Sequence, residues 1–168
     1  MTPGMPQIGF DRFIDLTWVE MAINVRRGAS SLEELNAMLD AARLGKEAKS
    51  KTRTKLNALV LEPRADMVEF IDRGISSCRA TDPNGELRAF AWGAAIATYP
   101  FFGKVAEFTG RLTSLQGDCS VAEIHRRMSE VYGDRQVTKR ATQAVIQTQT
   151  NWGAIKRIEK GKRLARLD

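Results

Sequence analysis

The stretch VYGDRQVTKRATQAVIQTQTNWG, residues 131–153, decides the architecture expected for the C-terminal part of the chain. It closes one apolar pattern, turns sharply at Gly133 and opens a second segment with helical periodicity. Small and apolar side chains share the stripe that we expect to face inward: Val137, Ala141, Ala144, Val145 and Thr148. Polar side chains share the opposite stripe: Gln136, Arg140, Gln143 and Gln147. The segment is therefore predicted to be an amphipathic helix with an amide-rich outer face.

The segments on either side extend this pattern. Upstream, Ser120 and Glu123 have the spacing of a capping box, which predicts the start of another helix. The apolar residues of that helix form its expected buried stripe: Val121, Ile124, Met128 and Val131. Downstream, AIKRIEKGKRLARLD, residues 154–168, has two short runs around a glycine turn and predicts a basic hairpin. The imperfect apolar spacing in its second half leaves a final helix as the alternative.

Helical signals continue through most of the preceding chain. Ser31 and Glu34 form a second capping box sequence, and Tyr99-Pro100 predicts a break, because the residue before proline avoids helical geometry. The uncharged stretch 89–103 is too short to cross a bilayer and predicts a buried helix. The sequence TDPNG, residues 81–85, predicts a turn.

These signals predict three segments and a fold class. Residues 1–62 form an N-terminal helical region with a candidate helix-turn-helix, residues 63–118 a central helical segment, and residues 119–168 a basic C-terminal segment. The expected fold class is all-α, a multi-helix protein with helix-turn-helix elements and a C-terminal winged-helix-like hairpin.

The charge of the chain is unevenly distributed. The 168 residues are 43% hydrophobic and 27% charged, which indicates a globular protein. Residues 120–168 carry 11 Lys and Arg against 5 Asp and Glu, so the whole net charge of +6 lies there, whereas residues 1–119 are neutral. This asymmetry indicates a polyanionic partner for the C-terminal end, and a solubilising surface is the alternative. The N-terminal stretch MTPGMPQIGF has neither the basic start nor the apolar core of a secretory signal, which predicts a cytoplasmic protein.

A helix, a tight turn, a second helix and a basic hairpin follow the order of a winged helix-turn-helix, so we expect double-stranded DNA as the partner. In the major groove, Arg pairs with guanine edges and Gln with adenine edges, which suits the outer stripe of residues 136–147. Two cations near the helix start are expected to contact phosphates: Arg135 and Lys139. The cations of the hairpin are expected to contact the flanking backbone or the minor groove: Lys156, Arg157, Lys160, Lys162 and Arg163. A cluster in the N-terminal segment is a second candidate phosphate contact: Lys49, Lys51, Arg53 and Lys55. For the outer stripe of residues 136–147 and for the N-terminal cluster, the alternative is a solvated helix face.

Candidate catalytic residues are few. His125 is the single histidine, and neither Cys78 nor Cys119 has the spacing of a metal or redox motif. We expect both cysteines to be reduced thiols, and a disulfide between them is the alternative. No phosphate-binding glycine loop or nucleophile motif occurs in the sequence. The sequence therefore predicts a protein that is not an enzyme and that needs no metal and no cofactor.

Several stretches resemble a known family. LRAFAWGAAIATYPFFGKVAEFTGRL, with its Tyr-Pro break between two apolar helices, is similar to the BrxA-type small accessory protein of BREX bacteriophage-exclusion systems. RRGASSLEEL, KTRTKLNAL and the helix-turn-helix after RLTSLQGDCSVAEI follow the same order, so the resemblance covers about residues 14–155. The very basic tail after Trp152 departs from it.

The resemblance implies an all-helical, non-enzymatic DNA-binding accessory of an antiviral defence system that modifies host DNA and gives phage resistance. It also implies larger partners, namely a methyltransferase, an ATPase and a phosphatase-like protein. The alternative from another class is a helical adaptor whose basic end binds an acidic protein or an RNA.

Overall fold

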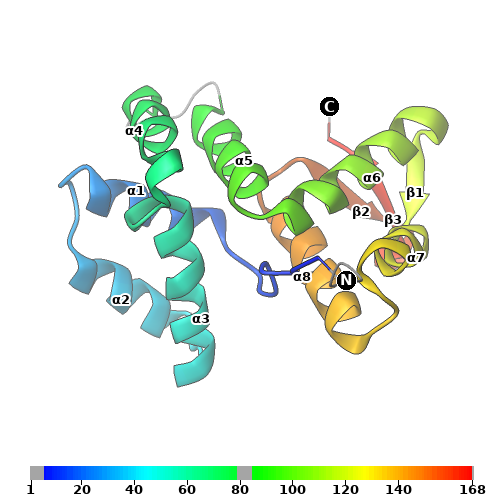
Figure 1. Ribbon diagram of the computed structural model, residues 1–168, viewed down its shortest axis with the longest axis horizontal. Helices are drawn as coiled ribbons and strands as arrows, with labels where there is room; N and C mark the ends of the chain where they lie inside the picture. The colour runs from blue at the N-terminus through cyan, green and yellow to red at the C-terminus, as the bar shows by residue number, and fades with distance from the viewer. Residues whose placement is uncertain (1–5, 79–84, 168) are drawn as a thin grey trace, which may run out of the picture. The chain divides into compact units, whose positions relative to one another are not determined.

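The computed structural model describes residues 6–78 and 85–167, which are mostly helical with a small three-stranded antiparallel sheet near the C-terminus (Figure 1). The chain divides into two compact units, one of residues 14–98 and one of residues 1–13 with 99–168. The boundary at residues 98–99 lies inside the predicted segment 63–118, at the Tyr99-Pro100 break. The turn predicted at residues 81–85 lies outside the described residues except for Gly85. Within the described ranges, the helices are all too short or too polar to cross a bilayer.

Residues 14–98 form a helical unit. Its helices are α1 (Leu16–Arg26), α2 (Leu32–Ala41), α3 (Lys46–Leu56), α4 (Val68–Ser77) and α5 (Glu86–Thr98). A π-helical turn, Asn57–Leu61, continues α3, and a 3-10 turn, Ala65–Met67, precedes α4. The predicted capping box of α2 is confirmed, because the Ser31 hydroxyl accepts from the Glu34 N–H at 3.2 Å and the Glu34 carboxylate accepts from the Ser31 N–H at 2.7 Å.

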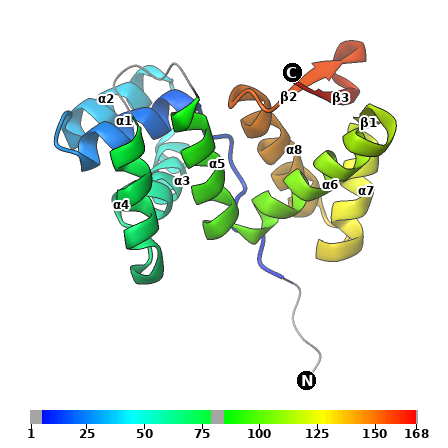
Figure 2. The same cartoon turned by 90° about the horizontal axis from the view of Figure 1, so that it is seen from above.

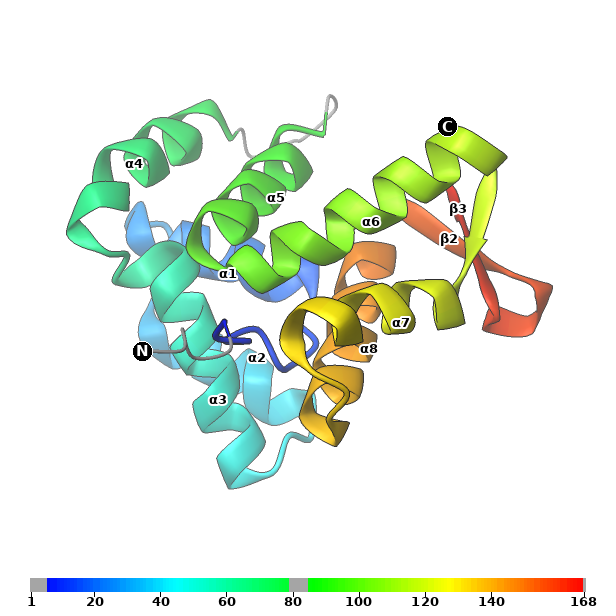
Figure 3. The same cartoon turned by 45° about the vertical axis from the view of Figure 1, so that its right-hand side comes forward.

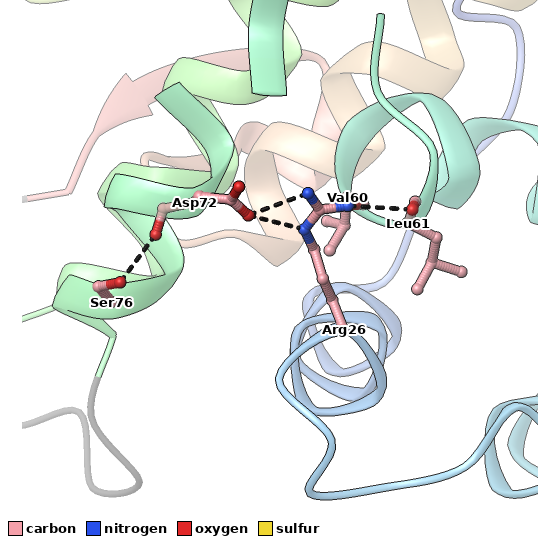
Figure 4. A network of polar contacts seen from close by, with 5 residues as sticks. All are labelled: Arg26, Val60, Leu61, Asp72 and Ser76. Carbon is pink, nitrogen blue, oxygen red and sulfur yellow. Dashed lines mark hydrogen bonds and ion pairs between the residues drawn. The ribbon is translucent and has the colours of Figure 1, made fainter. Parts of the chain in front are cut away.

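Arg26 connects three elements of this unit (Figure 4). Its guanidinium donates to the Val60 and Leu61 carbonyls, both at 3.1 Å, and to the Asp72 carboxylate at 2.9 and 3.0 Å. Val60 and Leu61 end the π-helical turn, where carbonyls have no partner within the helix. One side chain of α1 therefore satisfies the end of the α3 segment and binds α4.

We expect Arg26→Ala to lower the free energy of unfolding by about 1–3 kcal/mol, because it leaves two helix-end carbonyls and a carboxylate without their donor. Urea denaturation followed by circular dichroism measures this change. Arg73→Ala is the matched control, because the Arg73–Glu69 pair has side chains that are 80% and 78% exposed and should contribute less than about 0.5 kcal/mol. Equal effects of the two substitutions would contradict the role given to Arg26.

The second unit contains the sheet. Its elements are α6 (Pro100–Gln116), β1 (Asp118–Ser120), α7 (Val121–Tyr132), α8 (Gln136–Asn151), β2 (Ile155–Ile158) and β3 (Arg163–Arg166). The sheet order is β1-β3-β2, with both pairings antiparallel. Cys119 of β1 and Arg157 of β2 both lie opposite Leu164 of β3. The hairpin lies beside β1 at the C-terminal end of α6 (Figures 2 and 3).

Three predictions for this unit are tested directly. The Tyr99-Pro100 break is confirmed, since Tyr99 is extended and Pro100 is the first residue of α6. The capping box of Ser120 and Glu123 is confirmed at the start of α7. The basic hairpin is confirmed as β2 and β3, so the alternative of a final helix is wrong. The all-α prediction missed β1, because a strand of three residues is too short to show an alternating pattern.

Each of the predicted buried stripes of α7 and α8 contains one exposed residue, and Val121 of α7 is half-buried. Val131 and Val137 are 38% and 43% exposed, and the neighbouring Tyr132 and Thr138 are buried instead. Thr138 and Thr142 can be buried because their hydroxyls donate to the carbonyls of Tyr132, at 3.5 Å, and Thr138, at 2.8 Å. Ala144, also expected to face inward, is half-buried, whereas Ala141, Val145 and Thr148 are buried as predicted.

The core of this unit is aromatic around α6. Phe102 packs against Phe10 of the N-terminal segment and against Trp152, with ring centroids 5.2 and 5.5 Å apart. Phe101 packs edge-on against Tyr132, with ring centroids 4.7 Å apart.

Both cysteines of the chain are buried thiols rather than a disulfide, and burial raises the pKa of Cys119 to about 11. Cys119 therefore remains a thiol at neutral pH.

Candidate nucleic-acid interface

The corner between α7 and α8 is held by its own residues. Gly133 ends α7 with a φ of +90°, a conformation that other residues rarely adopt, and Arg135 is the N-cap of α8. The Arg135 guanidinium donates to the Tyr132 carbonyl at 3.0 Å. These contacts join the end of α7 to the start of α8, so the direction of α8 is fixed within the unit.

The polar stripe of α8 is exposed as expected. Four side chains predicted to face outward all face solvent: Gln136, Arg140, Gln143 and Gln147. The face opposite is the buried one described above. Gln149, in contrast, is completely buried and donates to the Phe102 carbonyl at 3.4 Å. Position on the helix, rather than residue type, therefore separates the outer amides from the inner one.

The hairpin presents the predicted cations unequally. Lys156, Lys160 and Lys162 are exposed, and within residues 6–78 and 85–167 no carboxylate pairs with them. Arg157 is also exposed and donates to the Gly161 carbonyl at 3.3 Å. Arg163 differs, because it donates to Asp118 at 2.6 and 3.0 Å, and this hydrogen bond raises the pKa of its guanidinium. The structure therefore places Arg163 in the contact between β3 and β1.

The cations at the start of α8 also contact other groups of the same unit. Lys139 lies 3.7 Å from the Asp134 carboxylate, and Arg135 binds the Tyr132 carbonyl. Burial, together with the charge of Lys139, lowers the pKa of His125 below its ordinary value of 6.5. His125 is therefore neutral at pH 7 and adds no positive charge to this end of α8. Arg140 has no ion pair in the described part of the chain and keeps its full charge toward solvent.

One groove joins the two sets of side chains. It has a volume of about 810 Å³ and lies between the start of α7, the outer face of α8 and the hairpin. Gln143 and Gln147 of α8 line it together with three cations and one acidic residue of the hairpin: Arg157, Lys162, Arg163 and Glu159. Residues from the start of α7 form another wall: Ser120, Val121 and Ala122. Amides that can read base edges and cations that can bind phosphate therefore share one surface.

The predicted cluster on α3 belongs to the other unit and is largely neutralised. Lys49 pairs with Asp40 at 2.6 Å and Lys51 pairs with Glu47 at 2.9 Å. Arg53 donates to the Asn36 side chain. Lys55, the remaining member, is half-buried. The cluster thus presents less net positive charge than its residues alone predict.

Sequence reasoning missed two features of this surface. Asp118 neutralises Arg163 across 45 residues of sequence, and no local pattern signals such a pair. The wall formed by the start of α7 depends on β1, which the periodicity did not reveal.

Comparison of the chain with family models, with curated proteins and with solved structures gives no match.

The tip of the hairpin is strained. Glu159 and Lys160 have φ values of +50° and +56°, and Gly161 follows with +84°. Residues with a Cβ avoid this left-handed region at a cost of about 1–2 kcal/mol each. Tight hairpin turns need such φ values and usually use Asn and Gly for them, so Glu and Lys are unfavourable choices for stability here.

We expect Lys160→Gly to raise the free energy of unfolding by about 0.5–1 kcal/mol, because glycine adopts this conformation without strain. Gly161→Ala is the matched control and should lower it by about 1 kcal/mol, since an added Cβ meets only the Arg157 side chain, at 3.7 Å, and the cost is therefore that of the backbone. Thermal melts of both variants, compared with the wild type, measure the two changes in stability. A destabilised Lys160→Gly would mean that the tip is not strained.

Proposed function

We propose that residues 99–168 form a winged helix-turn-helix that binds double-stranded DNA and that the chain is a non-enzymatic accessory protein of a BREX-like phage-defence system. The order α6, β1, α7, α8, β2, β3 supports this proposal, because a tight turn joins two helices and a basic hairpin follows them. The observation that carries it is the groove in which the amides of α8 and the cations of the hairpin meet.

The second helix has suitable dimensions and chemistry for the major groove. α8 has 16 residues, so it is about 24 Å long, and the major groove admits a single helix. In this proposal Gln136, Arg140, Gln143 and Gln147 face base edges. The lysines of the hairpin, with Arg157, bind the flanking phosphates, and Arg135 and Lys139 bind phosphates near the start of α8. The α3 cluster is a second phosphate contact of lower charge.

The cellular role rests on the resemblance rather than on the groove. A BREX-like accessory would act in the bacterial cytoplasm beside a methyltransferase, an ATPase and a phosphatase-like protein, and it would need no cofactor. Its part would be to hold DNA for these partners. Loss of phage protection in cells that carry the whole locus with a variant unable to bind DNA tests this part of the proposal.

Binding should depend steeply on salt. If the protein neutralises about five to six phosphates, the logarithm of affinity falls against the logarithm of salt concentration with a slope of roughly −4 to −6. Fluorescence anisotropy with a labelled DNA duplex between 50 and about 200 mM salt measures the slope. A slope near zero, or no binding at low salt, would end the DNA proposal.

Charge reversal should separate the contribution of the proposed interface to DNA affinity from that of the net charge of the protein. Arg140→Glu, Lys160→Glu and Lys162→Glu together change the net charge by six units at exposed positions, and we expect duplex affinity to fall at least about 100-fold. The matched control is Arg64→Glu, Arg73→Glu and Arg88→Glu, which makes the same change at exposed positions of the unit of residues 14–98, outside the α3 cluster. We expect the control to bind within about tenfold of the wild type.

Two results would contradict this assignment. Equal losses in the two triple variants would show that the net charge of the protein, and not the proposed interface, sets the affinity. Tighter binding to an RNA duplex than to DNA would favour the RNA-binding adaptor instead, because the narrow major groove of A-form RNA does not admit a helix such as α8. Thermal melts of both variants show whether each is folded.

A further inference from the structure

Val137 is an apolar residue that the fold leaves partly exposed beside the polar face of α8. Its side chain, in the first turn of α8, is 43% exposed, so burial stabilises only part of it. As a β-branched residue, it also costs helix stability relative to alanine, because its χ1 angle is restricted against the preceding turn. The sequence pattern assigned the inward position to Val137, but its neighbour Thr138 occupies that position instead.

The place of Val137 on α8 is specific. It follows Gln136 directly and precedes Arg140 by three residues, so it lies about 60° around the helix from Arg140 and beside the polar stripe. The N-terminal residues of the second helix are those that contact base edges in helix-turn-helix complexes with DNA. An amide and an exposed apolar group are thus consecutive in the first turn of α8, about 100° apart around the helix axis, where base contact is expected.

An A·T pair presents a matching set of groups in the major groove. Adenine offers the N7 acceptor and the N6 donor, which a Gln side chain can bind together, and thymine offers a C5-methyl group, which an apolar side chain can cover. A G·C pair has neither the adenine pattern nor the methyl group. The first turn of α8 therefore has one side chain for each half of an A·T pair.

We infer that Gln136 and Val137 determine specificity for an A·T pair, Gln136 by binding the N6 and N7 edge of adenine and Val137 by covering the thymine methyl group. This inference rests on the proposed function, since it requires α8 to lie in the major groove. To the proposed function it adds the kind of base pair that the protein selects. It also adds Val137 as a base-contacting residue, which is uncharged and makes no side-chain hydrogen bond.

The test uses base analogues in a duplex of alternating A and T, in which every base pair is an A·T pair in one orientation or the other. Replacing thymine by uracil removes only the methyl group, and replacing adenine by 7-deazaadenine removes only the N7 acceptor. We expect wild-type protein to bind the uracil duplex about fourfold more weakly, as for the loss of one buried methyl group. It should bind the 7-deazaadenine duplex at least about fivefold more weakly.

Variants assign each loss to one side chain. In Val137→Ala the difference between thymine and uracil should disappear, whereas Val131→Ala, a valine of similar exposure on α7, should keep it. In Gln136→Ala the effect of 7-deazaadenine should disappear, whereas Gln116→Ala, an exposed amide of α6, should keep it. Each comparison uses the same two duplexes, so effects of the analogue on DNA shape cancel.

The outcomes separate this inference from the proposed function. Duplex binding with equal affinity for thymine and uracil in wild-type protein, or with a difference that persists in Val137→Ala, would overturn the role of Val137. Persistence of the 7-deazaadenine effect in Gln136→Ala would likewise overturn the role of Gln136. Absence of binding to every duplex at low salt would overturn the proposed function and this inference with it.

Discussion

The pairing of β1 with β3 is the contact on which the arrangement of the C-terminal unit depends. Two nitrogens of the Arg163 guanidinium donate to one carboxylate oxygen of Asp118 across this pairing, and Cys119 lies opposite Leu164, both completely buried. The Val121 N–H also donates to the Lys162 carbonyl at 2.9 Å, which joins the start of α7 to the hairpin. A two-stranded hairpin alone is marginally stable, so the third strand is what holds the hairpin beside the helices.

This constraint divides the cations of the hairpin into two groups. Arg163 and Arg166 are used inside the unit, the first on Asp118 and the second on the Gly110 carbonyl and the hydroxyls of Thr113 and Ser114. The hairpin lysines precede these two arginines in the sequence, and all three are exposed: Lys156 on β2, Lys160 in the turn and Lys162 directly after it. Arginine suits the inner positions because its planar fork makes several directed hydrogen bonds at once, whereas lysine presents a compact charge. The same segment can therefore stabilise the sheet and present a basic surface.

Burial of threonine along α8 has a similar double effect. The hydroxyls of Thr138, Thr142 and Thr148 donate to helix carbonyls and can be packed without leaving a polar group unsatisfied. This arrangement leaves the opposite face for the glutamines and Arg140. It also explains why the pattern misplaced Val137: the inward position was assigned to the apolar valine, whereas Thr138 occupies it because its bonded hydroxyl can be buried.

The sequence by itself determined the features whose causes act within a few residues. Two capping boxes, the break before Pro100, the glycine turn at Gly133 and the polar face of α8 all follow from local geometry and spacing. The basic hairpin was also predictable, because its turn and its two runs are adjacent in sequence.

Only the tertiary structure decided which charged groups remain available and which surfaces meet. Arg163 is neutralised by Asp118 and Arg26 by Asp72, across 45 and 46 residues of sequence, and Lys49 pairs with Asp40 of the preceding helix. The groove between α8 and the hairpin depends on β1, a strand too short for any periodic signal. Ion pairing and strand pairing depend on distance in space, and a local pattern carries no information about groups that the fold brings together from far along the chain.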